Sequence, residues 1–548
     1  MEFLWVEGKT IYAGNSPVLL RGFGLGGWFL PEGYMWKLYK KCDRPRRMEA
    51  MIAGLCGEAY AKQFWHRYFD SYITEDDIKL IASEGFNSIR LPLNARHLLG
   101  KRNDRLILLP EMLHRLDRCI EWCGKYHIYV ILDMHAAPGG QTGQNIDDSE
   151  ADLPYLFMDA KYIEELSFLW KSLAERYRKE PVIAGYDLLN EPVPKFFSEY
   201  NSGVLPLYRR LIREIREIDD KHMLILEGVH WATDFSIFDP FTREEAADNI
   251  VLQFHKYWSN PDAESLTEYI EASERLQVPL FMGEGGENNN EWYTTIFPLY
   301  EQLNISWSFW VYKKMDCANS PLTFDVPDGW EELLEWIDKK GGLDTKRAVQ
   351  IFDNFITCIQ NSRVNQEVFN ALGRKSPVKI PCEAYNACRI LSKRVRGARL
   401  REQEPVSIVF ASGKAGDVDY KRYGGEEQPE DENLLIILSA GDRAGYLFYS
   451  EKEAISIKIA MSGGGTLSVA TATDCSGIYS CGHSGDNTLD DTLLIDTEPD
   501  KIWIDKKSVI VKGFSEYTVA LSSTPGQKQY LWLVCDSGYV KADNITIA

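Results

Sequence analysis

Eight short apolar runs recur along the first two thirds of the chain, and segments of helical character separate most of them. Each run has the length of a buried strand, and most end abruptly in polar residues or glycines. Eight buried strands that alternate with helices are typical of a (β/α)₈ barrel, an α/β fold. The runs cover residues 18–28, 86–93, 129–135, 183–192, 222–228, 250–257, 279–286 and 306–313.

A doubly wound open sheet is the alternative arrangement of such runs. In that fold, functional groups gather at one switch point between strands. Here polar or aromatic residues close nearly every run, which favours a barrel, because a barrel builds its site from the carboxyl ends of all its strands. These closing residues are Trp28, Arg90, His135, Asn190, Glu191, His255, Tyr257, Glu284 and Trp310.

The sequence changes character after residue 372, where short β-rich runs separated by turn residues begin to dominate. This pattern is typical of a β-sandwich. We therefore predict a barrel with an N-terminal β-hairpin over residues 1–372, a connecting segment over 373–394, and a β-sandwich over 395–548. The sandwich loosely resembles carbohydrate-binding modules, but we prefer a role in stability or assembly alone. Its expected strands cover residues 407–410, 434–438, 455–459, 493–495, 508–511, 517–521 and 530–534.

Three features near the N-terminus carry further expectations. Residues 3–20 read as a hairpin that could close one end of the barrel. A charged, helical insertion is expected over about residues 36–70, and Thr74 to Asp77 form a capping-box start for the next helix. Gly24 and Gly26 form a G-x-G pattern, but no helix opens directly on them, so we expect a close approach of the backbone to a neighbour rather than a dinucleotide site.

Composition limits the partners and the compartment. The net charge of −20 argues against nucleic acid and anionic lipid as partners. No apolar run has the length of a membrane span, and the N-terminus lacks the features of a secretory signal. The odd count of 11 cysteines suits a reducing compartment, with Cys475 and Cys481 expected to be free thiols rather than a small bridge. We expect a cytoplasmic protein, or a secreted one if a signal segment has been removed.

Glu191 and Glu284 form a candidate catalytic pair, because each closes a buried run. Glycoside hydrolysis uses two carboxyl groups, one as a proton donor and one as a nucleophile or base. In a retaining mechanism the two groups lie about 5–5.5 Å apart, and their surroundings must separate their pKa values. Arg90, at the end of a third run, could hold Glu284 as the anion and leave the proton on Glu191.

Other chemistries find less support. Asp133 and His135 offer only one imidazole, and the sequence has no His-x-His or His-Glu-x-x-His pair, so we expect no metal. There is no Gly-x-Ser-x-Gly elbow and no phosphate-binding loop with a lysine, so no serine nucleophile and no cofactor are expected.

The chain resembles glycoside hydrolase family 5 across about residues 15–350, because it carries the motifs of that family in order. They are Ile89–Pro92, Leu132–His135, Asn190–Pro192, His255–Tyr257, Gly283–Glu284 and Phe309–Trp310. The resemblance implies a retaining β-glycosidase barrel with Glu191 as the acid/base and Glu284 as the nucleophile.

The same resemblance assigns roles to the supporting residues. It implies that Asn190 binds the sugar 2-hydroxyl and that Arg90 and Tyr257 support the nucleophile. It also implies a subsite for the cleaved sugar, lined by His135, His255 and Trp310.

Two further segments are similar to one branch of the family, the exo-acting β-glucanases and the glycolipid glycosidases. They are Leu25–Glu32, which contains Trp28, and the loop Ala137–Gln141. In that branch, the acidic residue that corresponds to Glu32 binds hydroxyl groups of the terminal sugar. We therefore predict exo-action on β-glucosides or related small oligosaccharides and glycoconjugates. The alternatives are an endo-acting cellulase or mannanase, and a non-catalytic sugar-binding protein on a barrel scaffold.

Overall fold

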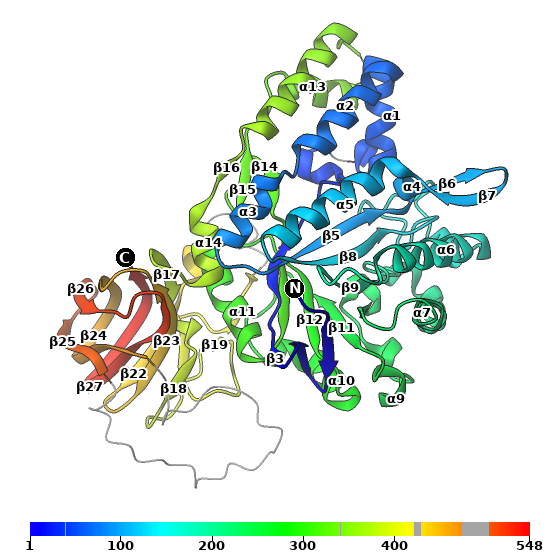
Figure 1. Cartoon of the computed structure of the whole chain (residues 1–548). Coiled ribbons are helices and arrows are strands. Elements are labelled where there is room, and N and C mark those ends of the chain that lie inside the picture. The colour runs from blue at the N-terminus through cyan, green and yellow to red at the C-terminus, as the bar shows by residue number, and fades with distance from the viewer. Residues whose placement is uncertain (39, 340, 421–428, 474–502) are drawn as a thin grey trace. The chain divides into compact units, whose positions relative to one another are not determined.

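Eight parallel strands close into a barrel in the computed structural model, which describes all residues except 39, 340, 421–428 and 474–502. Around the barrel the strands follow one another in chain order, and the last pairs with the first (Figure 1). This confirms the predicted fold class. The strands are β4 (Arg21–Gly24), β5 (Ser88–Asn94), β8 (Tyr129–Ala136), β9 (Ile183–Asp187), β10 (Met223–Glu227), β11 (Ile250–His255), β12 (Leu280–Gly286) and β13 (Ser306–Trp310).

Strand β9 ends at Asp187, before the predicted end at residue 192. The chain leaves the sheet there because Glu191 and Val193 have positive φ angles of 44° and 52°, which a strand cannot accommodate. The residues between the strand and this turn are therefore free to place side chains over the barrel mouth.

Helical segments, of which the longer ones are amphipathic, separate most of the strands. Helix α5 buries Met112, Leu116, Ile120 and Cys123, which recur every three or four residues on one face. The predicted capping box is present before α3, where the Thr74 N–H donates to Asp77 at 2.7 Å. These helices are α3 (Glu75–Ser83), α4 (Ala95–Leu98), α5 (Pro110–Lys125), α6 (Ala160–Tyr177), α7 (Asn201–Arg216), α8 (Val229–Ala232), α9 (Arg243–Ala246) and α10 (Thr267–Leu276).

The N-terminal hairpin closes the amino-terminal end of the barrel, as predicted. It consists of β1 (Leu4–Glu7) and β2 (Thr10–Ala13), with the short β3 (Ser16–Pro17) beside them. Leu4 and Ile11 are buried in one hydrophobic cluster with side chains from five barrel strands. Burying this surface closes the barrel end opposite to the strand tips, so the site must lie at the other end.

The expected helical insertion is present as two helices, α1 (Pro45–Cys56) and α2 (Glu58–Ser71), which lie beside α13 (Thr345–Gln360) in Figure 1. Aromatic side chains fill the space between them, and the ring centroids of Trp36 and Phe355 are 4.3 Å apart. The same compact unit contains α12 (Trp330–Lys339) and the short strands β6 (Leu99–Arg102), β7 (Arg105–Leu108), β14 (Lys313–Met315), β15 (Leu322–Phe324) and β16 (Arg363–Val364).

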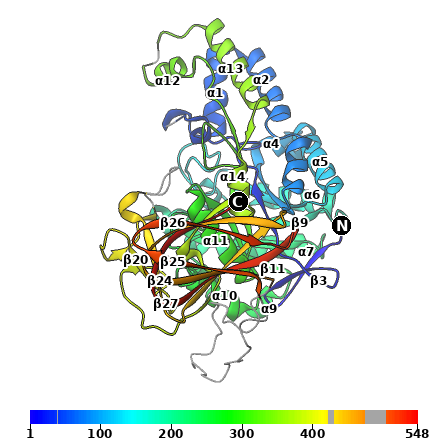
Figure 2. The same ribbon diagram turned by 90° about the vertical axis from the view of Figure 1, so that its left-hand side faces the viewer.

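A second compact unit comprises residues 257–267, 287–303 and 365–548. Most of its strands form one antiparallel sheet, which confirms the predicted all-β region. Figure 2 shows its long strands β24 and β27, which pair along most of their length. The predicted strand at 493–495 and the cysteines 475 and 481 lie outside the described residues.

The elements of this unit are α11 (Asn290–Gln302), α14 (Gln366–Gly373), β17 (Val378–Pro381), β18 (Ala387–Arg389), β19 (Ala398–Arg399), β20 (Ser407–Phe410), β21 (Gly416–Asp417), β22 (Leu434–Ser439), β23 (Arg443–Ser450), β24 (Ala454–Ala472), β25 (Trp503–Lys512), β26 (Ser515–Ser522) and β27 (Gln527–Ile547). Across both units, the described helices include none with the length and apolar character needed to cross a membrane.

Candidate active site

The two predicted catalytic acids meet at the carboxyl-terminal mouth of the barrel. Glu284 lies on β12, and Glu191 lies in the turn that follows β9. One carboxylate oxygen of each lies within 4.8 Å of the other. Both residues are almost fully buried, at 7% exposure for Glu191 and 4% for Glu284. The separation is close to the about 5–5.5 Å of retaining glycosidases and well below the about 6.5–9.5 Å of inverting ones.

Arg90 organises the floor of the site. Its side chain is fully buried, and its Nη1 donates to Glu284 at 2.5 Å. Nη2 donates to Asn190 at 2.8 Å and to Glu227 at 3.0 Å, while Nε donates to Asp187 at 2.8 Å. The rigid fork of a guanidinium suits several acceptors at fixed angles. One side chain on β5 thereby fixes groups from β9, β10 and β12.

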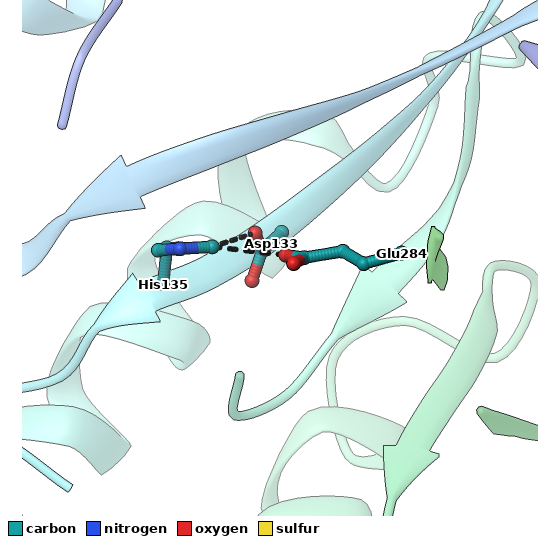
Figure 3. A group of neighbouring side chains, drawn as sticks. All are labelled: Asp133, His135 and Glu284. Atoms are coloured by element: carbon teal, nitrogen blue, oxygen red, sulfur yellow. Dashed lines mark hydrogen bonds and ion pairs between the residues drawn. The ribbon is translucent and has the colours of Figure 1, made fainter. Parts of the chain in front are cut away.

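His135 faces two carboxylates, Asp133 and Glu284, with one edge of its ring (Figure 3). Its Nδ1 lies 2.7 Å from Asp133 and 3.8 Å from Glu284. The imidazole is nearly parallel to the Trp310 ring, with 5.3 Å between centroids. The stacked pair forms a wall of the site on the side of Glu284.

His255 lies close to both acids. Its Nδ1 lies 2.7 Å from Glu191 and 3.7 Å from Glu284, while Nε2 lies 3.5 Å from Glu227. The pKa of His255 is raised well above its ordinary value, because the charges of Glu227 and Glu284 and the hydrogen bond to Glu191 outweigh the lowering effect of burial. A protonated His255 therefore lies within hydrogen-bond distance of Glu191.

The electrostatics of Glu284 differ from the expectation that Arg90 alone fixes the anion. Burial raises the pKa of Glu284, and the nearby Glu191 raises it further, although His255 and Arg90 lower it. The net pKa is above the ordinary value. Burial, followed by the charge of Glu227, also raises the pKa of Asp187 well above its usual range. The surroundings of Glu284 and Asp187 therefore favour their protonated forms more than water would.

The structure brings Trp310 and the glycine-rich segment of β4 together. A side chain at Gly24 or Gly26 would collide with the Trp310 ring, at 2.5 Å in both cases. The expected close approach of the backbone is thus present. The Trp310 indole N–H donates to Tyr34 at 3.0 Å, two residues beyond the buried Glu32.

Two predicted residues lie in other surroundings. Trp28 is fully buried, packs against Phe29 with 4.0 Å between ring centroids, and donates its N–H to the carbonyl of Phe69. This is the environment of a core tryptophan. Tyr257 follows β11 but belongs to the second compact unit, where it packs against Trp258.

Sequence reasoning did not identify Glu227, although it is the third acid that closes an apolar run. Its Oε2 accepts the backbone N–H of Glu191 at 2.6 Å, and its Oε1 accepts from Arg90 and from Gln253. The signal was the same as for the two catalytic acids, because Glu227 ends the strand Met223–Glu227. Gln253 and Asp187 complete the same hydrogen-bonded layer.

Among the described residues, two groups of three side chains have donor atoms close enough to hold a metal ion: Asp133, His135 and Glu284, and Glu191, His255 and Glu284. Both share Glu284, whose carboxylate already accepts from Arg90 at 2.5 Å. A divalent cation bound there would face a fully buried guanidinium and a histidine of raised pKa. The charges of the site therefore favour an ion-pair network over a metal centre.

The fold and the paired acids define a barrel of the glycosidase class. Residues 52–316 match the family profile described as Cellulase (glycosyl hydrolase family 5). Over these residues, the match confirms the resemblance to glycoside hydrolase family 5.

Three relatives illustrate the range of the family. A "Beta-xylosidase" from Phanerodontia chrysosporium is 34% identical over 47% of this chain and 52% of its own length. "Endoglucanase C" from Acetivibrio thermocellus is 28% identical over 46% of this chain and 88% of its own length. "Probable glucan 1,3-beta-glucosidase A" from Aspergillus fumigatus is 25% identical over 44% of this chain and 56% of its own length. The chain therefore spans about half the length of the first and third of these relatives.

Proposed function

We propose that this protein is a retaining glycoside hydrolase that releases sugars by exo-action from β-glucosides or related small oligosaccharides and glycoconjugates. The observation that carries the proposal is the distance within 4.8 Å between the carboxylates of Glu191 and Glu284. That gap leaves no room for the water that an inverting enzyme places between its acids.

In the first half-reaction, Glu284 attacks the anomeric carbon and Glu191 protonates the departing oxygen. His255 lies 2.7 Å from Glu191 and has a raised pKa, so its positive charge stabilises the carboxylate that Glu191 becomes once it has given up its proton. Arg90 provides the positive charge that favours the Glu284 anion when substrate binds. Asn190, held by Arg90, is oriented to bind the sugar hydroxyl next to the anomeric carbon.

In the second half-reaction, the glycosyl-enzyme ester removes the negative charge of Glu284. Glu191 has then given up its proton, and it acts as the base that activates water. The water attacks the anomeric carbon and displaces Glu284, so the product regains the β configuration. The proton taken from water restores the acid form of Glu191 for the next cycle.

Exo-action is supported by the burial of both acids and by two relatives whose names describe a β-xylosidase and a β-glucosidase. Endo-action remains the second candidate, because an endoglucanase matches this chain over 88% of its own length. Product lengths over time separate the two. Exo-action releases monosaccharides from the start, whereas endo-action first yields a ladder of intermediate fragments.

The test of the proposal is the Glu284→Ala variant assayed with aryl β-glycosides. We expect hydrolysis to fall by several orders of magnitude and sodium azide to restore part of the turnover, giving the α-glycosyl azide. The exposed Glu217, at the end of α7, provides a control, and Glu217→Ala should behave as the wild type. Full activity of Glu284→Ala without azide would overturn the assignment.

A further inference from the structure

An aromatic strip of four side chains lies on two loops next to Glu191. Phe196, Phe197 and Tyr200 belong to the 3₁₀ helix η4 (Lys195–Tyr200), and Trp231 follows β10. Ring centroids are 6.1 Å apart for Trp231 and Phe196, 4.9 Å for Phe196 and Phe197, and 6.5 Å for Phe197 and Tyr200. The four rings therefore form a continuous surface.

This aromatic strip is not part of the hydrophobic core. No residue of η4 is buried, and Phe196 is 55% exposed. Contiguous exposed apolar surface is uncommon on soluble proteins and marks a binding region more often than a scattered apolar residue does. The aromatic strip thus exposes apolar rings beside the catalytic acid.

The backbone that carries Trp231 is strained. His230, Trp231 and Ala232 have φ angles of 55°, 61° and 57°, three successive left-handed residues without a glycine. The left-handed conformation is unfavourable for residues that carry a side chain, and strained residues of this kind cluster at functional sites. The His230 N–H is held by the carbonyl of Val193 at 2.9 Å, two residues after Glu191. This hydrogen bond joins the turn that carries Trp231 to the loop that carries Glu191.

The catalytic roles of the two acids indicate which part of the substrate lies next to the aromatic strip. The sugar under attack must lie against Glu284 and its wall of His135 and Trp310. Glu191 gives its proton to the departing oxygen, so the leaving group extends beyond Glu191. The loops on that side are those after β9 and β10, which carry the aromatic strip.

Most of the polar groups beside the rings are paired with one another. Asn201 Nδ2 lies 3.1 Å from His230 Nε2, and His230 Nδ1 lies 3.0 Å from Asp234. Asn201 Oδ1 is buried and has no partner within the described chain. A second sugar would bring several hydroxyls that each need a partner, whereas an alkyl or aryl group needs apolar surface.

We propose that the aromatic strip binds the leaving group and selects β-glycosides with an apolar alkyl or aryl aglycone. This inference rests on the proposed function and narrows its substrate class to glycoconjugates of that kind. The aglycone lies across Phe196 and Trp231 while the sugar lies against Glu284.

The test first identifies the sugar whose aryl β-glycoside is hydrolysed fastest. It then compares the methyl and hexyl β-glycosides of that sugar. Methanol and hexanol are similar leaving groups, so kcat/KM reports the binding of the chain. Full burial of one methylene group raises kcat/KM about fourfold, and contact along only one side of the methylene raises it about twofold. We therefore expect the hexyl glycoside to exceed the methyl glycoside by about 30-fold.

Variants locate the effect. Phe196→Ala and Trp231→Ala should each reduce the ratio of hexyl to methyl kcat/KM to about fivefold or less. Trp5, 39% exposed on the N-terminal hairpin and stacked on Tyr12, is a matched surface aromatic, and Trp5→Ala should leave the ratio unchanged.

The outcomes separate this inference from the proposed function. Hydrolysis with a ratio near one, or a high ratio that survives both variants, would overturn only the assignment of the aromatic strip. A disaccharide cleaved faster than the hexyl glycoside would also overturn it. The absence of hydrolysis of every aryl, methyl and hexyl glycoside would overturn the proposed function itself.

Discussion

Replacing Glu227 with glutamine should change the pH dependence of catalysis as well as the stability of the protein. The Glu227 carboxylate accepts the Glu191 N–H at 2.6 Å and faces His255 Nε2 at 3.5 Å. Two unit charges at that distance attract by about 5 kcal/mol at an effective dielectric constant of about 20. The glutamine removes this attraction and turns an N–H group toward Arg90 or toward the Glu191 amide.

The expected losses follow from these contacts. Breaking a buried ion pair costs about 3–5 kcal/mol of unfolding free energy. A charge-assisted hydrogen bond contributes about 1.5–3 kcal/mol, so kcat/KM should fall about 10- to 100-fold. The raised pKa of His255 should fall, because the charge of Glu227 is the largest influence that raises it. The proton shared with Glu191 would then be lost at lower pH, and the alkaline limb of kcat/KM should shift to lower pH.

The pH profile of kcat/KM between pH 4 and 10, with urea denaturation of the same samples, measures both effects. Glu49 is a matched control, because its carboxylate also pairs with an arginine and a histidine, Arg96 and His97, but lies outside the site. Glu49→Gln should lower stability and leave the profile unchanged. An unshifted alkaline limb in Glu227→Gln, with only a loss of stability, would refute the positioning role.

Three further outcomes are expected. Glu191→Gln should slow glycosides with poor leaving groups far more than activated aryl glycosides, because only the former need a proton; equal losses in a leaving-group series would contradict this. Arg90→Lys should lose about 3–5 kcal/mol of unfolding free energy in urea and most activity, since one ammonium cannot replace a fork with several carboxylate contacts; near-native stability would contradict it. Burial raises the pKa of Glu49, but hydrogen bonds from His97 and Arg96 outweigh it and lower the pKa from 4.5 to about 2. The ionised Glu49 therefore stabilises the fold by about 3 kcal/mol above pH 4.5, and this stabilisation is lost as the pH falls to about 2. Acid unfolding of Glu49→Gln in urea should lack this loss.

The barrel could be predicted because each strand is buried on both faces and reads as a continuous apolar run. The paired acids could be found for the same reason, since a charge that ends such a run stands out. Glu227 has the same signal in sequence, but its partners Arg90 and Gln253 lie on other strands. Only the closed barrel brings those strands together.

Backbone conformation accounts for the other features that the sequence did not predict. The residue types of His230, Trp231 and Ala232 do not predict three successive left-handed residues, because none of the three favours that conformation strongly. Their geometry depends on long-range contacts such as the bond from His230 to Val193. By contrast, Gly24 and Gly26 did predict that the backbone lies close to a neighbouring group, although that group, Trp310, lies far along the chain.

The stereochemistry of the first-formed product tests the central claim most directly. Proton NMR of a β-glycoside digest, recorded within minutes and before mutarotation, reports the anomer that is released. With Glu191 and Glu284 within 4.8 Å, the account predicts that the β anomer appears first and the α anomer accumulates only afterwards. Initial release of the α anomer would contradict double displacement at this pair of acids.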